Sequence, residues 1–254
     1  MGQPVAGDIR VGTSGWQYDD WDGRFYPDGV ARTRWFDHYA KIFPTVEVNY
    51  SFYRLPRTST TQRWHDRAPN RFRYACKGSR YVTHNLKLGE GSAEAVGNVM
   101  QRMAPLKTFL AVMLWQLPPN LGKDVPRLDR FVSILPAGVG HAVEFRHTSW
   151  IDDEVFDTLD RHGVAHVWLS SRRMPPDRTR TGDLVYVRFH GLGEEQYRYD
   201  YSPSELEPWA EAVVEAVADG SDAYVYFNND YQANAPRNAR TFIELLGDAA
   251  LPWP

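Results

Sequence analysis

The sequence of 254 residues predicts an α/β fold in which eight parallel strands close into a (β/α)8 barrel of the TIM type. Three observations support this prediction. Short apolar runs recur along the chain, helical patterns separate most of them, and the total length suits eight such units. No linker, composition break or repeat of fixed period divides the chain, so residues 1–254 are interpreted as a single domain.

Eight runs rich in β-branched and aromatic residues, each bounded by turn residues, predict the strands. They lie at residues 9–15, 45–52, 71–78, 110–118, 141–147, 165–171, 184–191 and 222–229. Strands that alternate with helices pair in parallel through right-handed crossovers. The first and last strands are therefore expected to pair and to close the barrel.

Apolar residues at helical spacing predict helices at residues 32–43, 92–106, 152–163 and 202–220. Ser202 is a candidate N-cap of the last helix, with Pro203 at the first helical position and Glu205 as capping-box partner. Ser204 with Glu207 has the same spacing and is an alternative start. The segment 172–183, between strands six and seven, is too short and too rich in Pro and Arg for a full helix, so a bare loop is expected there.

The composition excludes several classes of protein. A content of 43% hydrophobic and 24% charged residues is typical of a globular protein, and the net charge of -3 gives no whole-surface argument for nucleic acid or acidic membranes. Cys76 is the only cysteine, so neither an internal disulfide nor a cysteine zinc cluster can form. No apolar run approaches the ~18 residues of a membrane span, and the N-terminus lacks an apolar signal segment. A cytoplasmic protein without a membrane partner is expected, and its oligomeric state stays open.

The alternation of side chains within the strands assigns polar residues to the barrel interior. Side chains on a strand point alternately to two faces, and the outward face must pack on helices and stay apolar. Val143 and Phe145 share one face of their strand, while Glu144 and Arg146 share the other. Similar polar residues gather at the carboxyl ends of the strands, where barrel enzymes keep their active sites. They are Glu47, Asn49, Lys77, Gln116, Glu144, Arg146, Arg188, His190 and Asn228.

Two interpretations fit this inward charge. Ion pairs such as Glu144 with Arg146, or Glu47 with Lys77, can simply fill the barrel. A buried pair adds little net stability compared with apolar residues of equal volume, so several of them at one end favour a functional pocket. The aromatic content of 14% likewise fits either a core of large side chains or a stacking site for a ring-bearing ligand.

Motifs at the strand ends resemble a known family. They are GTSGW (12–16), VEVN (46–49), FYRLP (52–56), KGSRYVTH (77–84), QLPP (116–119), EFRHTSW (144–150), VRFHG (187–191) and FNN (227–229). They resemble the domain of unknown function 72 family, also called YecE-like, from about residue 9 to 247. The resemblance implies a TIM-type barrel of uncertain biochemistry. That family has been likened to the sugar isomerase and apurinic endonuclease barrels, which suggests phosphorylated sugars or nucleic acid as ligands.

The charges at the strand ends favour an oxyanion over a metal ion. His190 and the two glutamates could ligate zinc, but three cations from the same strand ends would repel a divalent ion. No metal and no cofactor is therefore expected, with a divalent metal as the minor alternative. Arginine can hold an oxyanion through two hydrogen bonds, and amide and aromatic groups can bind the rest of a ligand. The predicted substrate-binding residues are Asn49, Tyr53, Lys77, Gln116, Arg146, Trp150, Arg188 and Asn228.

Three residues are candidates for proton transfer. Glu47 and Glu144 are candidate general acids or bases, and His190 is a candidate proton shuttle or, equally, a hydrogen-bonded core histidine. The predicted function is a hydrolase or lyase acting on a phosphorylated sugar or a phosphodiester. The alternatives are a non-catalytic barrel that binds nucleic acid through loop arginines and aromatics, and a glycosidase that uses the two glutamates as acid and base. The expected partner is a small phosphorylated or sugar-like ligand, with nucleic acid as the alternative.

Overall fold

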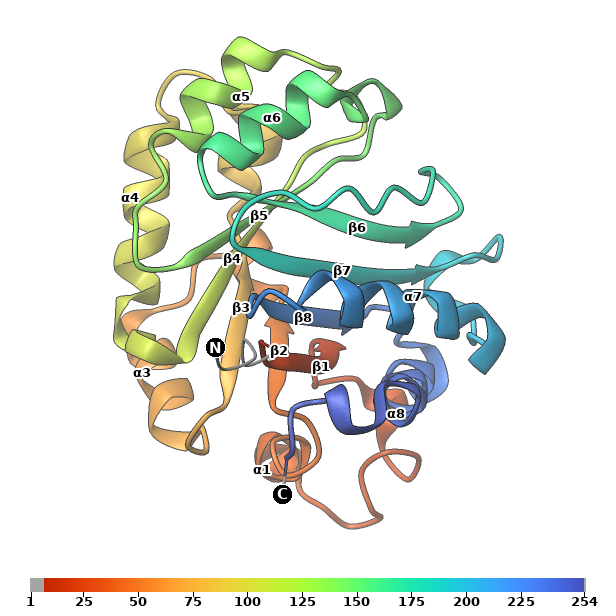
Figure 1. The fold of residues 1–254 in the computed structure, drawn as a ribbon. Helices are drawn as coiled ribbons and strands as arrows, with labels where there is room; N and C mark the ends of the chain where they lie inside the picture. The colour runs from red at the N-terminus through yellow and green to blue at the C-terminus, as the bar shows by residue number, and fades with distance from the viewer. Residues whose placement is uncertain (1–6, 254) are drawn as a thin grey trace, which may run out of the picture. The chain divides into compact units, whose positions relative to one another are not determined.

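The strands of the chain form a closed barrel in the order β1 to β8, which confirms the predicted (β/α)8 fold (Figure 1). The computed structural model describes residues 7–253, apart from the side chain of Gln196. All eight predicted strands are present. They are β1 (Ile9–Ser14), β2 (Thr45–Val48), β3 (Arg73–Lys77), β4 (Leu110–Gln116), β5 (Gly140–Glu144), β6 (Ala165–Ser171), β7 (Leu184–Gly191) and β8 (Asp222–Phe227).

Helices follow most of the strands. They are α1 (Trp35–Tyr39), α2 (Tyr50–Tyr53), α3 (Thr58–Arg67), α4 (Ser92–Met103), α5 (Val125–Val132), α6 (Asp153–Arg161), α7 (Pro203–Ala216) and α8 (Asn234–Leu246). The predicted capping box of α7 is confirmed, with the Ser202 side chain and the Glu205 carboxylate bonding reciprocally to backbone N–H groups. The helix ends at Ala216 rather than near Gly220, where the backbone already turns with a positive φ. No helix lies within residues 172–183, all of them described, so the expected bare crossover is confirmed.

The chain divides into two compact units. Unit 1 takes the described residues of Met1–Glu47, Leu169–Pro176 and Leu184–Pro254, and unit 2 takes Val48–Trp168 and Asp177–Asp183. The interpretation of residues 1–254 as a single domain stays a prediction.

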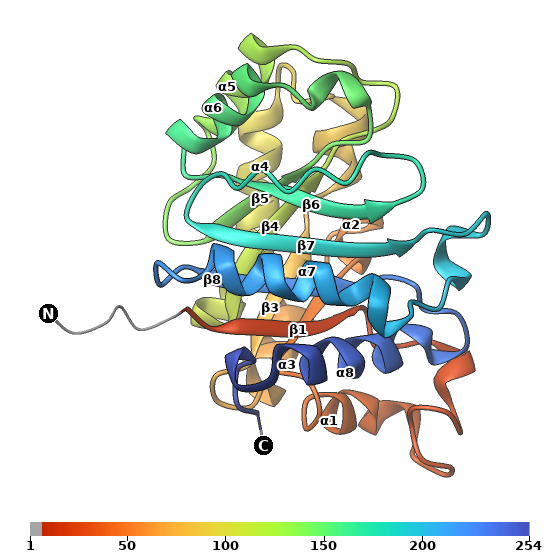
Figure 2. The ribbon, with the colours of Figure 1, turned by 45° about the vertical axis from the view of Figure 1, so that its right-hand side comes forward.

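In unit 1, β1 pairs in parallel with both β2 and β8, and β7 pairs with β8. The first and last strands therefore pair as predicted. Helix α8 packs against β1 and β8, and α7 packs against α8 (Figure 2). Phe189 of β7 stacks on Phe227 of β8 with ring centroids 4.5 Å apart, and both rings contact Phe242 of α8. These outward-facing aromatics form the apolar layer between strands and helices that the alternation predicts.

In unit 2, β3, β4, β5 and β6 pair in parallel in that order. The Trp115 ring of β4 meets Phe131 of α5 edge-on at 5.5 Å, and its Nε1 donates to His141 of β5. Helices α5 and α6 pack side by side in this unit (Figure 1). The next residue on β4, Gln116, and its register partner Glu144 on β5 close the carboxyl ends of these two strands.

Within residues 7–253, no helix is long and apolar enough to cross a membrane. The cytoplasmic location stays a prediction.

Candidate functional site

A fully buried ion pair occupies the interior of unit 1. The Arg188 Nη2 of β7 donates to the Glu47 Oε1 of β2 at 2.6 Å, and the two side chains are 1% and 0% exposed. Ser14 Oγ donates to the same carboxylate oxygen and the Tyr186 hydroxyl to the other, both at 2.7 Å. β1 and β8 separate these two strands in the barrel order, so the pair crosses the interior rather than following one sheet edge. Three donors, from Arg188, Ser14 and Tyr186, therefore stabilise the Glu47 carboxylate.

The end of β7 carries His190, which is buried. The amide nitrogen of Asn228 lies 2.9 Å from its Nδ1, and the ring of Tyr197 meets the imidazole edge-on at 5.8 Å. An amide donor at Nδ1 places the proton of the neutral ring on Nε2. The structure thus brings together two predicted site residues, His190 and Asn228, and fixes the orientation of the imidazole.

Asp230, in the loop that follows β8, is a functional candidate for which the sequence suggested no role. Burial raises the pKa of its carboxyl to about 6, with the negative charge of Asp20 adding to the effect. The indole Nε1 of Trp21 donates to its backbone carbonyl at 2.7 Å. Tyr18 lies near enough that burial, followed by the charges of Asp230 and Glu47, raises the pKa of its phenol well above the usual range. A carboxyl that titrates near neutral pH can both accept and release a proton.

The predicted residues of unit 2 come from adjacent strand ends. Lys77 ends β3, Gln116 ends β4 and Glu144 ends β5, and the register pairs Gln116 with Glu144. Glu144 is fully buried and accepts a hydrogen bond from Arg146 Nε. Arg146 lies two residues beyond the end of β5, so its charge belongs to the loop rather than to the strand predicted over 141–147.

Three cations surround a neutral histidine in unit 2. The Lys77 Nζ lies 4.1 Å above the centre of the Phe52 ring, and the His84 imidazole meets the same ring edge-on at 5.0 Å. Burial, and then the charges of Lys77, Arg80 and Arg146, lower the pKa of His84 to about 4. Burial is the larger cause, and the three positive charges add to it. We call Lys77, Arg80, His84 and Arg146 the cationic cluster.

The other predicted binding residues lie in different surroundings. The Tyr53 side chain on α2 is 78% exposed, whereas Trp150 is fully buried, stacks on Phe145 and donates to the Leu121 carbonyl at 2.7 Å. Asn49 lies one residue beyond β2, and its Oδ1 is buried without a hydrogen-bond partner among the described residues. Gln116 donates to the Leu117 carbonyl at 3.4 Å. Trp150 thus packs as a core residue of unit 2, while Tyr53 is open to solvent.

Among residues 7–253, no group of three or more His, Cys, Asp or Glu side chains is placed to hold a metal ion.

Comparison with known proteins identifies the family. The family model described as "Protein of unknown function DUF72" matches residues 10–254. The chain belongs to the DUF72 family. It is 25% identical to the UPF0759 protein YunF of Bacillus subtilis over 270 residues, which cover 94% of each chain. It is 31% identical to the UPF0759 protein YecE of Escherichia coli K12 over 142 residues, 54% of this chain and 52% of that one.

Two solved DUF72 structures have the same fold. The protein from Thermotoga maritima is 32% identical, has a TM-score of 0.86, and is matched over 94% of this chain and 99% of its own. One from Enterococcus faecalis is 20% identical with a TM-score of 0.80, over 94% of this chain and 95% of its own. The family is uncharacterised, so its membership establishes the fold and no specific activity.

Proposed function

We propose that this DUF72 protein is a hydrolase or lyase that acts on a phosphorylated sugar or a phosphodiester. The observation that carries the proposal is the cationic cluster of unit 2. The charges of Lys77, Arg80 and Arg146 add to burial in lowering the pKa of His84, so three cations act on one place, where an anion can neutralise them on binding.

The chemistry of the cluster suits phosphate. Arg80 and Arg146 offer planar guanidinium groups that can donate two hydrogen bonds each to phosphate oxygens, and Lys77 adds a compact charge. Phe52 holds the Lys77 ammonium by a cation–π contact. Neutral His84 can accept or donate a hydrogen bond without repelling a cationic neighbour. A phosphate group, rather than a neutral sugar, is therefore the moiety we propose for this cluster.

Four side chains are proposed for proton transfer, and they differ in how far they are exposed to solvent. Asp230 in unit 1 is half-buried, and a pKa of about 6 suits a general acid or base at neutral pH. Glu47, Glu144 and His190 remain proposed catalytic residues, although all three are buried. Glu144 can act through Arg146, to which it is bonded, by orienting the guanidinium toward substrate.

The test combines a binding measurement with an activity screen. Calorimetric titration with inorganic phosphate and with glucose 6-phosphate should show binding that Arg80→Gln weakens about tenfold, as expected for one charged hydrogen bond. Arg130→Gln is the matched control, because Arg130 is an exposed arginine on α5 of the same unit. A panel of phosphomonoesters and phosphodiesters should reveal turnover that Glu144→Gln, in the same unit as the cluster, abolishes.

Two outcomes contradict the proposal. If neither phosphate compound binds, or if Arg80→Gln and Arg130→Gln bind alike, the cluster is a solvated basic face. If only single-stranded oligonucleotides bind, with affinity falling steeply with salt and without turnover, the non-catalytic nucleic-acid interpretation is favoured.

A further inference from the structure

Three arginines line a small cavity at the start of α8 in unit 1. The cavity has a volume of about 110 Å³ and is lined by Arg24 from the segment after β1, by Arg237 and Arg240 of α8, and by Phe25 and Gln232. Pockets for whole drug-sized ligands measure roughly 300 to 1,000 Å³. A cavity of this size therefore suits one chemical group of a ligand rather than the entire molecule.

The charge around this cavity is unbalanced. Within residues 7–253, neither Arg24 nor Arg240 has a carboxylate within 4.0 Å, whereas Arg237 pairs with Asp200 at 2.8 Å. The Arg240 guanidinium lies 5.8 Å from the Phe25 ring centre. Two carboxylates adjoin the three cations: Asp200 pairs with Arg237, and Asp20 accepts from the backbone N–H of Gln232 at 2.6 Å. One positive charge is left in excess, which favours an anion.

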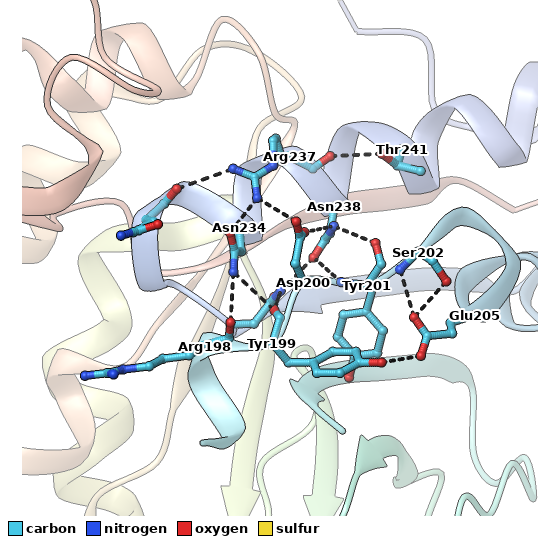
Figure 3. Close-up of polar contacts among 12 residues, drawn as sticks. Arg198, Tyr199, Asp200, Tyr201, Ser202, Glu205, Asn234, Arg237, Asn238 and Thr241 are labelled. Atoms are coloured by element: carbon cyan, nitrogen blue, oxygen red, sulfur yellow. Dashed lines mark hydrogen bonds and ion pairs between the residues drawn. The ribbon is translucent and has the colours of Figure 1, made fainter. Parts of the chain in front are cut away.

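A partly buried polar network holds Arg237 in position (Figure 3). Asp200 accepts from Arg237 Nη2 through one carboxylate oxygen and from Asn238 Nδ2, at 2.9 Å, through the other. Asn238 is buried and is bonded in turn to the backbone of Tyr201. Asn234, in the first turn of α8, accepts from the same arginine. A side chain held in place from behind loses little conformational freedom when it binds a ligand.

The cavity follows β8 and is lined by Gln232 and Ala233 of the short 3-10 helix Tyr231–Ala233 that precedes α8. The ring of His38 lies 5.5 Å from that of Phe25. Burial lowers the pKa of His38, and the positive charges of Arg240 and Lys41 lower it further.

We propose that Arg24, Arg237 and Arg240 form a binding site for a phosphate monoester group. The guanidinium planes can donate pairs of hydrogen bonds to the oxygens of a phosphate group. This site goes beyond the function proposed above, which needs only the cationic cluster of unit 2. Its residues are different, and it can be tested separately.

The experiment follows the backbone amides of residues 232–235 by two-dimensional NMR while inorganic phosphate, and then glucose 6-phosphate, is added at low salt. Phosphate should shift these amides in a saturable way. The Arg24→Gln, Arg240→Gln double variant should weaken that binding at least tenfold, while the Arg130→Gln control leaves it unchanged. Arg80→Gln should also leave it unchanged, which separates this site from the cationic cluster.

Three results overturn the proposal. The amides can fail to respond to either phosphate compound, or they can respond equally in the double variant. They can also respond to a single-stranded oligonucleotide without terminal phosphates and not to the monoester, in which case the cavity binds phosphodiesters. Because Arg24 and Arg240 are exposed, the double variant is expected to fold, and its melting temperature is the check.

Discussion

Replacement of Arg188 by methionine tests what the buried charge in unit 1 does. Methionine keeps most of the apolar volume but removes the cation that lies 2.6 Å from Glu47. The carboxylate would then remain buried with only the hydroxyls of Ser14 and Tyr186 as donors. Breaking a buried pair by removing one partner costs roughly 3 to 5 kcal/mol, because an uncompensated charge stays inside. We therefore expect Arg188→Met to destabilise the fold strongly.

The assay is thermal unfolding followed by circular dichroism. In a chain of this size each kcal/mol lowers Tm by roughly 2 to 4 °C, so the variant should melt about 6 to 20 °C below the wild type. The double variant Glu47→Gln, Arg188→Met removes both charges and should recover part of this loss, and the exposed Arg173→Met serves as control. Phosphate affinity is measured on the same samples, since the sequence also predicts Arg188 as an anion ligand. A variant that keeps its Tm within about 2 °C yet loses phosphate binding would refute the structural reasoning.

Four further outcomes are expected. Lys77→Met should raise the pKa of His84 from about 4 toward its usual value, because a neighbouring cation is removed, and an NMR titration of the imidazole checks this. The pKa of Asp230 is raised from 3.8 to about 6, so its charged form destabilises the fold as pH rises through that window. Asp230→Asn should thus be more stable than the wild type above pH 6, by about 1 to 3 kcal/mol, and equal near pH 3.5 in urea unfolding. Ser202→Ala should cost about 0.5 to 2 kcal/mol in the same assay, because α7 loses its cap. Gly12→Ala should reduce Tm or prevent folding, because a Cβ there would lie 2.2 Å from a carbonyl oxygen of β2.

The strands could be predicted because parallel strands are buried on both faces and are flanked by helices. Their apolar runs stand out from the polar turns, and alternation separates the two faces. Phe189 and Phe227 meet α8 as the outward face, while Glu47 and Arg188 meet inside. The inward direction of Glu47 and Arg188 could be predicted from local pattern alone, because side chains alternate within a strand whatever its neighbours are.

Strand ends could not be predicted with the same accuracy. The alternation of side chains continues after the strand hydrogen bonds stop, so Asn49 and Arg146 look like strand residues although β2 ends at Val48 and β5 at Glu144. The helix predicted over 32–43 is likewise reduced to Trp35–Tyr39, preceded by a 3-10 turn. Terminal turns depend on capping and tertiary contacts that a periodic pattern does not contain.

The raised pKa of Asp230 could not be predicted from the local sequence pattern. Nothing in the letters NNDYQAN distinguishes an exposed turn aspartate from one whose pKa is raised to about 6, because the shift comes mainly from burial. The pairing of Glu47 with Arg188, 141 positions apart in the chain, is equally a product of the closed barrel. Sequence can therefore propose which residues point inward, but not which of them are neutralised.

That distinction decides where a ligand is to be sought. Inward charge has two different causes in this protein. Glu47 and Arg188 compensate each other out of reach of solvent, which gives a ligand nothing to neutralise. Around His84, by contrast, burial and then the charges of Lys77, Arg80 and Arg146 lower the pKa of the histidine, although Arg146 also pairs with Glu144. Because three cations act together on His84, the cationic cluster is the stronger candidate for anion binding, and the buried pair of Glu47 with Arg188 is the stronger candidate for stability.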